Sequence, residues 1–251
     1  MVVTSSLNPV GLETKGWNGS SNEPWCVKLS MSQDDLLVYA TRLIDAHAPD
    51  GRKIELGRVM PIALERLEHC FLRIALAGFC DERGEATFDH LHGDQVAMFL
   101  YFAANTAWKE FNDVDLAKKL TLLNRDRHGL LVMYDTELPK IFVIPHTVGT
   151  VIGKGSYGNY AVFCQNVTTT NDYARLTVGN GVIFFPGAFV IGNCTIGDGA
   201  VVTANTTVTY DDIPPNTMAR GCSPKLELWR RERDFLARFF IPPYPGRESA
   251  R

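Results

Sequence analysis

The fold is decided by residues 178–208, which read VGNGVIFFPGAFVIGNCTIGDGAVVTANTTV. An aliphatic or aromatic side chain recurs here at every sixth position: Val178, Phe184, Val190, Ile196, Val202 and Val208. A smaller residue lies two positions before each of the last five: Val182, Ala188, Cys194, Ala200 and Thr206. Gly or Asn lies three positions after each of the first five: Gly181, Gly187, Asn193, Gly199 and Asn205. Because Gly and Asn adopt a left-handed backbone at the least cost, the stretch predicts a tight corner after every short strand.

A repeat of this kind builds a triangular solenoid of about 18 residues per turn, in which each coil buries its inward side chains on the next. The sequence therefore predicts a left-handed parallel β-helix. An antiparallel β-sandwich is the alternative, but its turns are expected every 8–12 residues or so. Upstream, a frame offset by two residues predicts inward positions at Ile152, Gly158 and Cys164, with Gly155 at a corner. The solenoid is expected to start near Lys140 and to be interrupted by a polar loop over 166–175.

The chain before the repeat has the periodicity of amphipathic helices. Helices are predicted from the N-cap Ser32, over 61–79 with Pro61 in the first turn, over 93–108, and after the N-cap Asp113. A further amphipathic helix is predicted over 227–240, packed across the solenoid or a neighbouring subunit, although its arginines and aromatic residues also permit RNA or membrane binding. The predicted fold is therefore α+β, with four parts: an N-terminal arm (1–30), an α-helical domain (31–138), a β-helix domain (139–226) and a C-terminal helix and tail (227–251).

Composition limits the class of partner. The 251 residues carry a formal charge of −3 at neutral pH, and 45% are hydrophobic. This balance does not favour binding to nucleic acid or to an acidic membrane, so we expect a small-molecule ligand or another subunit. The first residues lack the pattern of a signal peptide, which favours a cytoplasmic protein. The six cysteines are scattered without a C-x-x-C pair, and reduced thiols are expected.

Three segments of the second half carry a resemblance to a known family. They are residues 145–153 (PHTVGTVIG), 162–168 (VFCQNVT) and 212–225 (DIPPNTMARGCSPK). Together with the hexads between them, they resemble the serine acetyltransferases, which belong to the hexapeptide-repeat acyltransferases. The resemblance implies transfer of an acetyl group from acetyl-CoA, without a metal, by a homotrimer or a dimer of trimers. Serine or a related amino acid is the first expected acceptor and a sugar or amino sugar the second, while a catalytically silent assembly subunit remains an alternative.

The resemblance assigns the general base to His146, since imidazole titrates near neutral pH and can take a proton from an attacking hydroxyl. Counting back six residues from Ile152 also places His146 in the inward column, where it would be a hydrogen-bonded core residue. The sequence departs from the family at Pro145, where the family has Asp. It departs again near a second family histidine, where Tyr173 or Arg175 stands.

Further site residues follow from the same resemblance. Asp94 is expected to act with His146, and four residues are expected on the acceptor side: Asp89, His92, Tyr173 and Arg175. Acetyl-CoA is expected between subunits, with backbone groups near Gly187, Ala204 and Gly221 facing the pantetheine and Lys225 or Arg220 meeting a phosphate. The run HLHGD at 90–94 also suggests a metal cluster, but its side chains cannot all point one way on a strand or helix.

Overall fold

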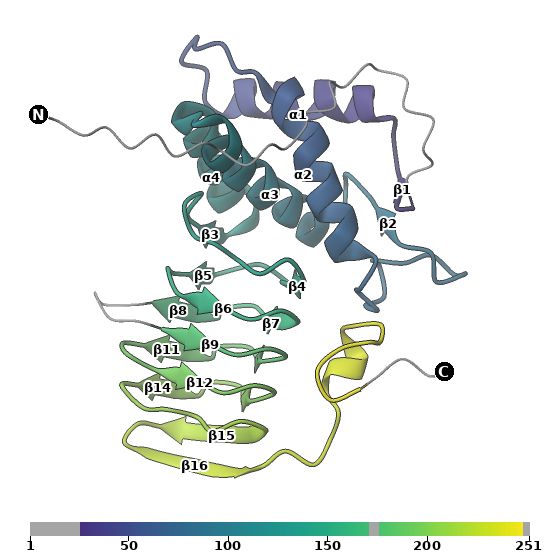
Figure 1. Ribbon diagram of the computed structural model, residues 1–251. Helices are drawn as coiled ribbons and strands as arrows, with labels where there is room; N and C mark the ends of the chain where they lie inside the picture. Colours follow the sequence, from purple (N-terminus) through teal and green to yellow (C-terminus); the bar gives the residue numbers. More distant parts are fainter. Residues whose placement is uncertain (1–25, 171–175, 248–251) are drawn as a thin grey trace, which may run out of the picture.

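The computed structural model describes residues 26–170 and 176–247 (Figure 1). A helical part formed by the first half of the chain sits on one end of a parallel β-helix formed by the second half, so the predicted α+β fold is confirmed. Most of the predicted N-terminal arm, and both Tyr173 and Arg175, lie outside the described residues. No helix within the described residues has the length and apolar character needed to cross a bilayer. All six cysteines lie in the described part of the chain and are free thiols.

Side-chain caps fix the starts of two helices, α1 and α4. α1 (Gln33–His47) begins after Ser32, whose hydroxyl accepts from the backbone N–H of Asp35 at 3.1 Å. α4 (Val114–His128) begins after Asp113, whose carboxylate accepts from the N–H of Leu116 at 3.0 Å. α3 (Gly93–Phe111) begins at the predicted residue and is the central helix, because every residue from Gln95 to Ala107 is buried. These caps confirm the predicted starts.

The second helix differs from its prediction. α2 spans Leu56–Phe71, so Pro61 lies inside it and the predicted span of 61–79 is wrong at both ends. The residues before Pro61 join the helix because Leu56, Val59 and Met60 are buried against the core, and this burial outweighs the backbone hydrogen bond that proline cannot donate.

The β-helix has three faces of stacked parallel strands (Figure 1). One face contains β3 (Leu130–Val132), β5 (Thr150–Ile152), β8 (Thr168–Thr170), β11 (Phe189–Ile191) and β14 (Thr207–Thr209). The second contains β4 (Phe142–Val143), β7 (Ala161–Phe163), β10 (Ile183–Phe184) and β13 (Val201–Val202). The third contains β6 (Ser156–Tyr157), β9 (Thr177–Val178) and β12 (Thr195–Ile196). β15 (Thr217–Cys222) pairs with both β13 and β14, and the helical part holds the short parallel pair β1 (Lys28–Leu29) and β2 (Thr87–Phe88).

The inward column of the β-helix matches the six-residue repeat. The side chains of Val178, Phe184, Val190, Ile196, Val202 and Val208 are all at most 2% exposed. The left-handed corners are also present at Gly181, Gly187, Gly199 and Asn205, with φ between 56° and 74°. Asn193 is the exception, since the left-handed residue of that corner is Gly192 (φ 91°).

The upstream frame is corrected by the strand register. Tyr157 pairs with Val178 and Phe163 with Phe184, so these aromatic residues, and not Gly158 and Cys164, occupy the inward column. Thr169 continues the column as a buried residue, because its hydroxyl is hydrogen-bonded to the Tyr157 hydroxyl at 2.8 Å. Residues 168–170 therefore form β8 within the solenoid, and the predicted loop over 166–175 is too long at its start.

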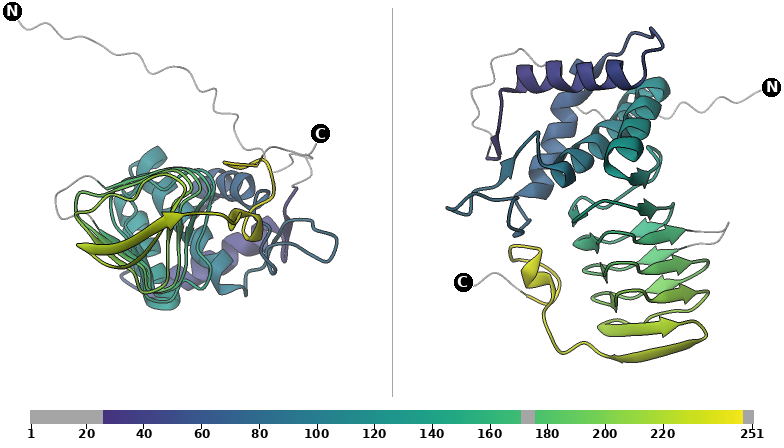
Figure 2. Two further views of the ribbon diagram at one scale, coloured as in Figure 1. Left: turned by 90° about the horizontal axis from the view of Figure 1, so that it is seen from below. Right: turned by 180° about the vertical axis from the view of Figure 1, so that it is seen from behind.

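The predicted C-terminal helix over 227–240 is wrong. Residues Lys225–Arg230 form β16, which pairs antiparallel with β15, and the only helical turn that follows within the described residues is the 3₁₀ turn Leu236–Arg238. β16 forms because β15 would otherwise present unpaired N–H and C=O groups at the end of the solenoid. Residues 231–247, here called the C-terminal strap, then run back beside the β-helix to the helical part (Figure 2).

Candidate functional site

His146 lies in the turn between β4 and β5, where the helical part meets the first coils of the β-helix. Its backbone is left-handed, with φ 56°, and its side chain is 77% exposed. The alternative in which His146 is a buried core residue is therefore wrong. A solvent-accessible imidazole is available to take up a proton.

Asp94 holds the turn that contains His146. It lies in the first turn of α3, and its carboxylate accepts from the backbone N–H of His146 at 2.8 Å and from that of Thr147 at 3.2 Å. The Nδ1 atom of His146 lies 3.8 Å from Oδ2 of Asp94, which is an ion-pair distance but too long for a hydrogen bond. The structure thus brings the two predicted residues together, with Asp94 bonded to the backbone of His146 and not to its ring.

His128 is a residue of this site that sequence reasoning missed. It ends α4, and its carbonyl oxygen accepts from the Thr147 hydroxyl at 2.8 Å. Burial and the nearby Arg127 lower the pKa of the His128 imidazole to about 4, although Asp94 acts in the opposite direction. Its buried Nε2 atom has no hydrogen-bond partner in the described part of the chain. The neutral imidazole of His128 therefore lies next to the turn that contains His146. In the sequence, the only sign of this role was the position of His128 at the end of a predicted helix.

The two described acceptor-side candidates do not join this cluster by hydrogen bonds. The exposed Asp89 carboxylate accepts from the N–H of Leu91 at 2.9 Å, and the ring of His92 packs edge-on against Phe79 with the centroids 5.5 Å apart. No group of three or more His, Cys, Asp or Glu residues that could hold a metal ion occurs among residues 26–170 and 176–247. Tyr173 and Arg175 lie outside the described residues.

The expected acetyl-CoA residues share one edge of the β-helix with His146. This edge, here called the His146 edge, comprises the corners at 146–149, 165–166, 186–187, 204–205 and 220–221. Adjacent corners are joined by hydrogen bonds of 3.0–3.1 Å, from Asn166 N to Val148 O, from Gly187 N to Gln165 O and from Asn205 N to Pro186 O. Gly221 adopts φ 103° at the last corner, and Lys225, Ala204 and Gly221 are exposed. The structure thus aligns Gly187, Ala204 and Gly221 with His146.

The C-terminal strap covers a different edge. Leu236 packs on Gly181, the ring of Phe240 lies edge-on to Tyr160 with the centroids 5.3 Å apart, and Arg231 N donates to Asn216 O at 2.8 Å. These partners are the corners between the third and second faces of the β-helix. The strap therefore leaves the His146 edge uncovered.

No protein-family model matches the sequence, and no curated protein matches it. The structure is similar to that of a Neisseria gonorrhoeae serine acetyltransferase in complex with serine, with TM-score 0.51 and 20% identity over 67% of this chain and 69% of that one. It is similar to a serine acetyltransferase in complex with CoA, with TM-score 0.55 and 17% identity over 68% and 72% of the two chains. It is also similar to the serine acetyltransferase of Vibrio cholerae O1 biovar El Tor N16961, with TM-score 0.52 and 16% identity over 78% and 72%. The chain therefore has the fold of the serine acetyltransferases.

Proposed function

We propose that this protein transfers an acetyl group from acetyl-CoA to the hydroxyl group of a small acceptor, with serine or a related amino acid as the first choice. The observation that carries the proposal is the exposed imidazole of His146, in a turn whose backbone Asp94 holds, at the head of an edge of the β-helix that the C-terminal strap does not cover. The similarity in fold to structures solved with serine and with CoA supports it.

The chemistry requires one proton acceptor and a donor thioester. His146 accepts the proton of the acceptor hydroxyl while the oxygen attacks the acetyl carbonyl, and the C–S bond breaks. The proton then passes from the imidazolium to the departing CoA thiolate. Asp94 acts as a positioning residue in this scheme, because both its oxygens bond the backbone of the His146 turn.

Acetyl-CoA is proposed to lie along the His146 edge. The backbone of Gly187, Ala204 and Gly221 leaves room there for the pantetheine, since these corner residues carry no side chain beyond a methyl group. Lys225 or Arg220 is proposed to meet a phosphate, although Arg220 also pairs with Glu227 at 2.5 Å. Asp89, His92, Tyr173 and Arg175 remain proposed acceptor-side residues, and we propose a homotrimer or a dimer of trimers.

The test is thiol release from acetyl-CoA, followed with a chromogenic thiol reagent, against L-serine, L-homoserine, simple sugars and amino sugars. His146→Asn is the sharpest variant, because Asn tolerates the left-handed backbone and leaves the fold intact while removing the base. We expect acceptor-dependent release by the natural protein and a loss of roughly 100-fold or more in the variant, with an unchanged thermal midpoint.

The acceptor that supports release distinguishes an amino-acid from a sugar acetyltransferase. Release that is equal in the variant would show that His146 is not the base. Absence of release with every acceptor, together with no acetyl-CoA binding by calorimetry, would instead identify a silent solenoid.

A further inference from the structure

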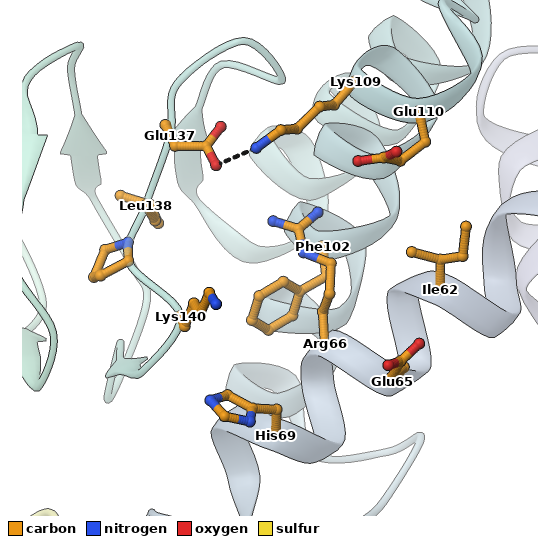
Figure 3. Close-up of a pocket in the computed structure, with 11 residues that line it drawn as sticks. Ile62, Glu65, Arg66, His69, Phe102, Lys109, Glu110, Glu137, Leu138 and Lys140 are labelled. Atoms are coloured by element: carbon orange, nitrogen blue, oxygen red, sulfur yellow. Dashed lines mark hydrogen bonds and ion pairs between the residues drawn. The ribbon is translucent and has the colours of Figure 1, made fainter. Parts of the chain in front are cut away.

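A cavity of about 570 Å³ lies away from the His146 edge, between α2, α3 and residues 137–140, which lead into β4 (Figure 3). Its apolar lining consists of Ile62, Phe102, Leu138 and Pro139. Its charged and titratable lining consists of Glu65, Arg66, His69, Lys109, Glu110, Glu137 and Lys140. A volume of this size accommodates a small organic molecule.

Arg66 is held in this cavity by uncharged partners. Its guanidinium donates to the Thr106 hydroxyl and to the Asn105 side-chain oxygen, both at 2.8 Å, and it lies 5.2 Å from the centroid of the Phe102 ring. All three partners are uncharged. Within the described residues no acidic side chain lies at ion-pair distance from Arg66. The guanidinium is thus fixed in place while its charge stays available.

Lys140 adds a second available cation. Lys109 is paired with Glu137 at 2.6 Å, whereas Lys140 has no ion-pair partner in the part of the chain that the structure describes. Figure 3 draws Lys140 and His69 on one side of the cavity, with Glu65 and Glu110 on the side of Arg66 away from Lys140. The cavity therefore combines two cations that form no ion pair within the described residues, Arg66 and Lys140, with an aromatic and aliphatic wall, while Glu65 and Glu110 lie on the far side of Arg66.

We propose that this cavity binds a small organic anion, whose carboxylate or phosphate group meets Arg66 and Lys140 and whose apolar part lies on Phe102 and Leu138. Guanidinium and ammonium groups are the usual partners of such anions. A bound anion would supply the negative charge with which Arg66 and Lys140 can form an ion pair. The site is separate from the proposed active site. Asp94 and Asn105 are eleven residues apart on α3, which is about 16 Å along the helix axis.

The test compares three aromatic probes of nearly the same shape: benzoate, phenyl phosphate and the neutral benzamide. Saturation-transfer NMR and calorimetry on the full chain are expected to detect binding of at least one of the two anions, with benzamide about tenfold weaker or worse. The comparison of benzoate with phenyl phosphate separates a carboxylate from a phosphate preference. Lys140→Gln is expected to weaken binding of the anion about tenfold. Lys118 is an exposed lysine on α4, and Lys118→Gln is expected to leave binding of the anion unchanged.

Binding of benzamide equal to that of the tighter of the two anions, no binding of either anion, or no effect of Lys140→Gln would each overturn the proposal. Saturating acetyl-CoA is expected not to displace the anion. Displacement would place the anion at the His146 edge instead and would also contradict the proposal. Neither outcome depends on whether the chain catalyses acetyl transfer, so the two proposals fail independently.

Discussion

The imidazole of His146 reaches solvent because its backbone is left-handed, with φ 56°, a conformation that costs a residue with a Cβ atom about 1–2 kcal/mol. The two N–H groups of this turn donate to the single carboxylate of Asp94, and charge-assisted hydrogen bonds of this kind are strong enough to offset that cost. The side chain proposed as the base is thus oriented by a residue from another element.

Replacing Asp94 tests this dependence. Asp94→Ala removes both acceptors, so we expect acetyl transfer to fall by about 10- to 100-fold and the free energy of unfolding to fall by about 1–3 kcal/mol. Asp94→Asn keeps one acceptor oxygen and is expected to lie between Ala and the natural residue in both measurements. Thiol-release kinetics and urea unfolding give the two values, and full activity of Asp94→Ala would contradict the positioning role.

His128 predicts a pH dependence of stability. Burial lowers the pKa of its imidazole to about 4 in the folded chain, from the usual value of 6.5, so below about pH 6.5 the unfolded chain binds a proton that the folded chain does not. This contribution to stability is complete above that pH and is lost as the pH falls towards 4. Because the imidazole is still partly exposed, we expect a loss of about 1–2 kcal/mol.

The measurement is the free energy of unfolding of the natural protein and of His128→Gln between pH 7 and pH 4. The natural protein is expected to lose free energy of unfolding as the pH falls, relative to the variant, because glutamine does not titrate. The difference in free energy of unfolding between the two proteins should therefore narrow or reverse. A constant difference would show that His128 contributes nothing to the acid dependence.

At the scale of the element, the corners of the β-helix set how closely its coils stack. Gly187 adopts φ 74° at a corner of the His146 edge, and a Cβ atom added there would lie 2.3 Å from Oδ1 of Asn205 on the next coil. A side chain at this position therefore meets an unfavourable backbone conformation and must displace the exposed amide of Asn205.

We expect Gly187→Ala to lower the free energy of unfolding by about 1–2 kcal/mol, which is the backbone cost plus the cost of moving the Asn205 side chain. Gly84→Ala is the matched control, since Gly84 has φ 79° but no atom within 4 Å of an added Cβ, and only the backbone cost of about 1 kcal/mol applies. Urea unfolding of both variants gives the comparison. Equal losses of stability in the two variants would mean that the Asn205 side chain moves aside at no cost and that only the backbone conformation matters.

At the scale of the whole molecule, the C-terminal strap joins the far end of the β-helix to the helical part (Figure 2). Ile241 N donates to Arg73 O, and Ala75 N donates to Phe239 O, both at 2.8 Å. Leu236 and Phe240 are buried at its two contacts, on the β-helix and on the helical part respectively. The strap thus adds a second contact between the two parts of the chain, beside the contacts that Asp94 and His128 make with the turn of His146.

Leu236→Ala tests how much this second contact contributes. Removing a fully buried leucine side chain is expected to lower the free energy of unfolding by about 2–5 kcal/mol, and to increase hydrogen exchange at the N–H groups of Ala75 and Ile241. Arg233→Ala, at an exposed position of the same strap, is expected to change stability by less than about 0.5 kcal/mol. Unchanged hydrogen exchange at the N–H of Ala75 in Leu236→Ala would show that the two contacts of the strap, with the β-helix and with the helical part, are independent of each other.

The sequence alone determined the parts of this fold whose cause is local or repeats at a fixed spacing. The helix starts at Ser32 and Asp113 follow from side-chain caps three residues away, and the inward column from Val178 to Val208 follows from a six-residue period that every coil obeys. His146 and Asp94 were also identified from sequence, through motif resemblance and position. Only the tertiary structure decided how they meet, because the Asp94 carboxylate reaches a turn 52 residues away.

The same reason explains the errors. Residues 227–240 have a helical pattern, but Lys225–Arg230 pair with the open edge of β15, and the strap that follows finds its partners at Arg73 and Ala75, more than 150 residues earlier in the chain. The inward positions of Tyr157 and Thr169 follow from their pairing with Val178 and Val190 on the next coil, which lie 21 residues later in the sequence instead of 18. The exposure of His146 and the neutral imidazole of His128 likewise arise from packing between the helical part and the β-helix, since burial and left-handed backbone are set by contacts distant in sequence.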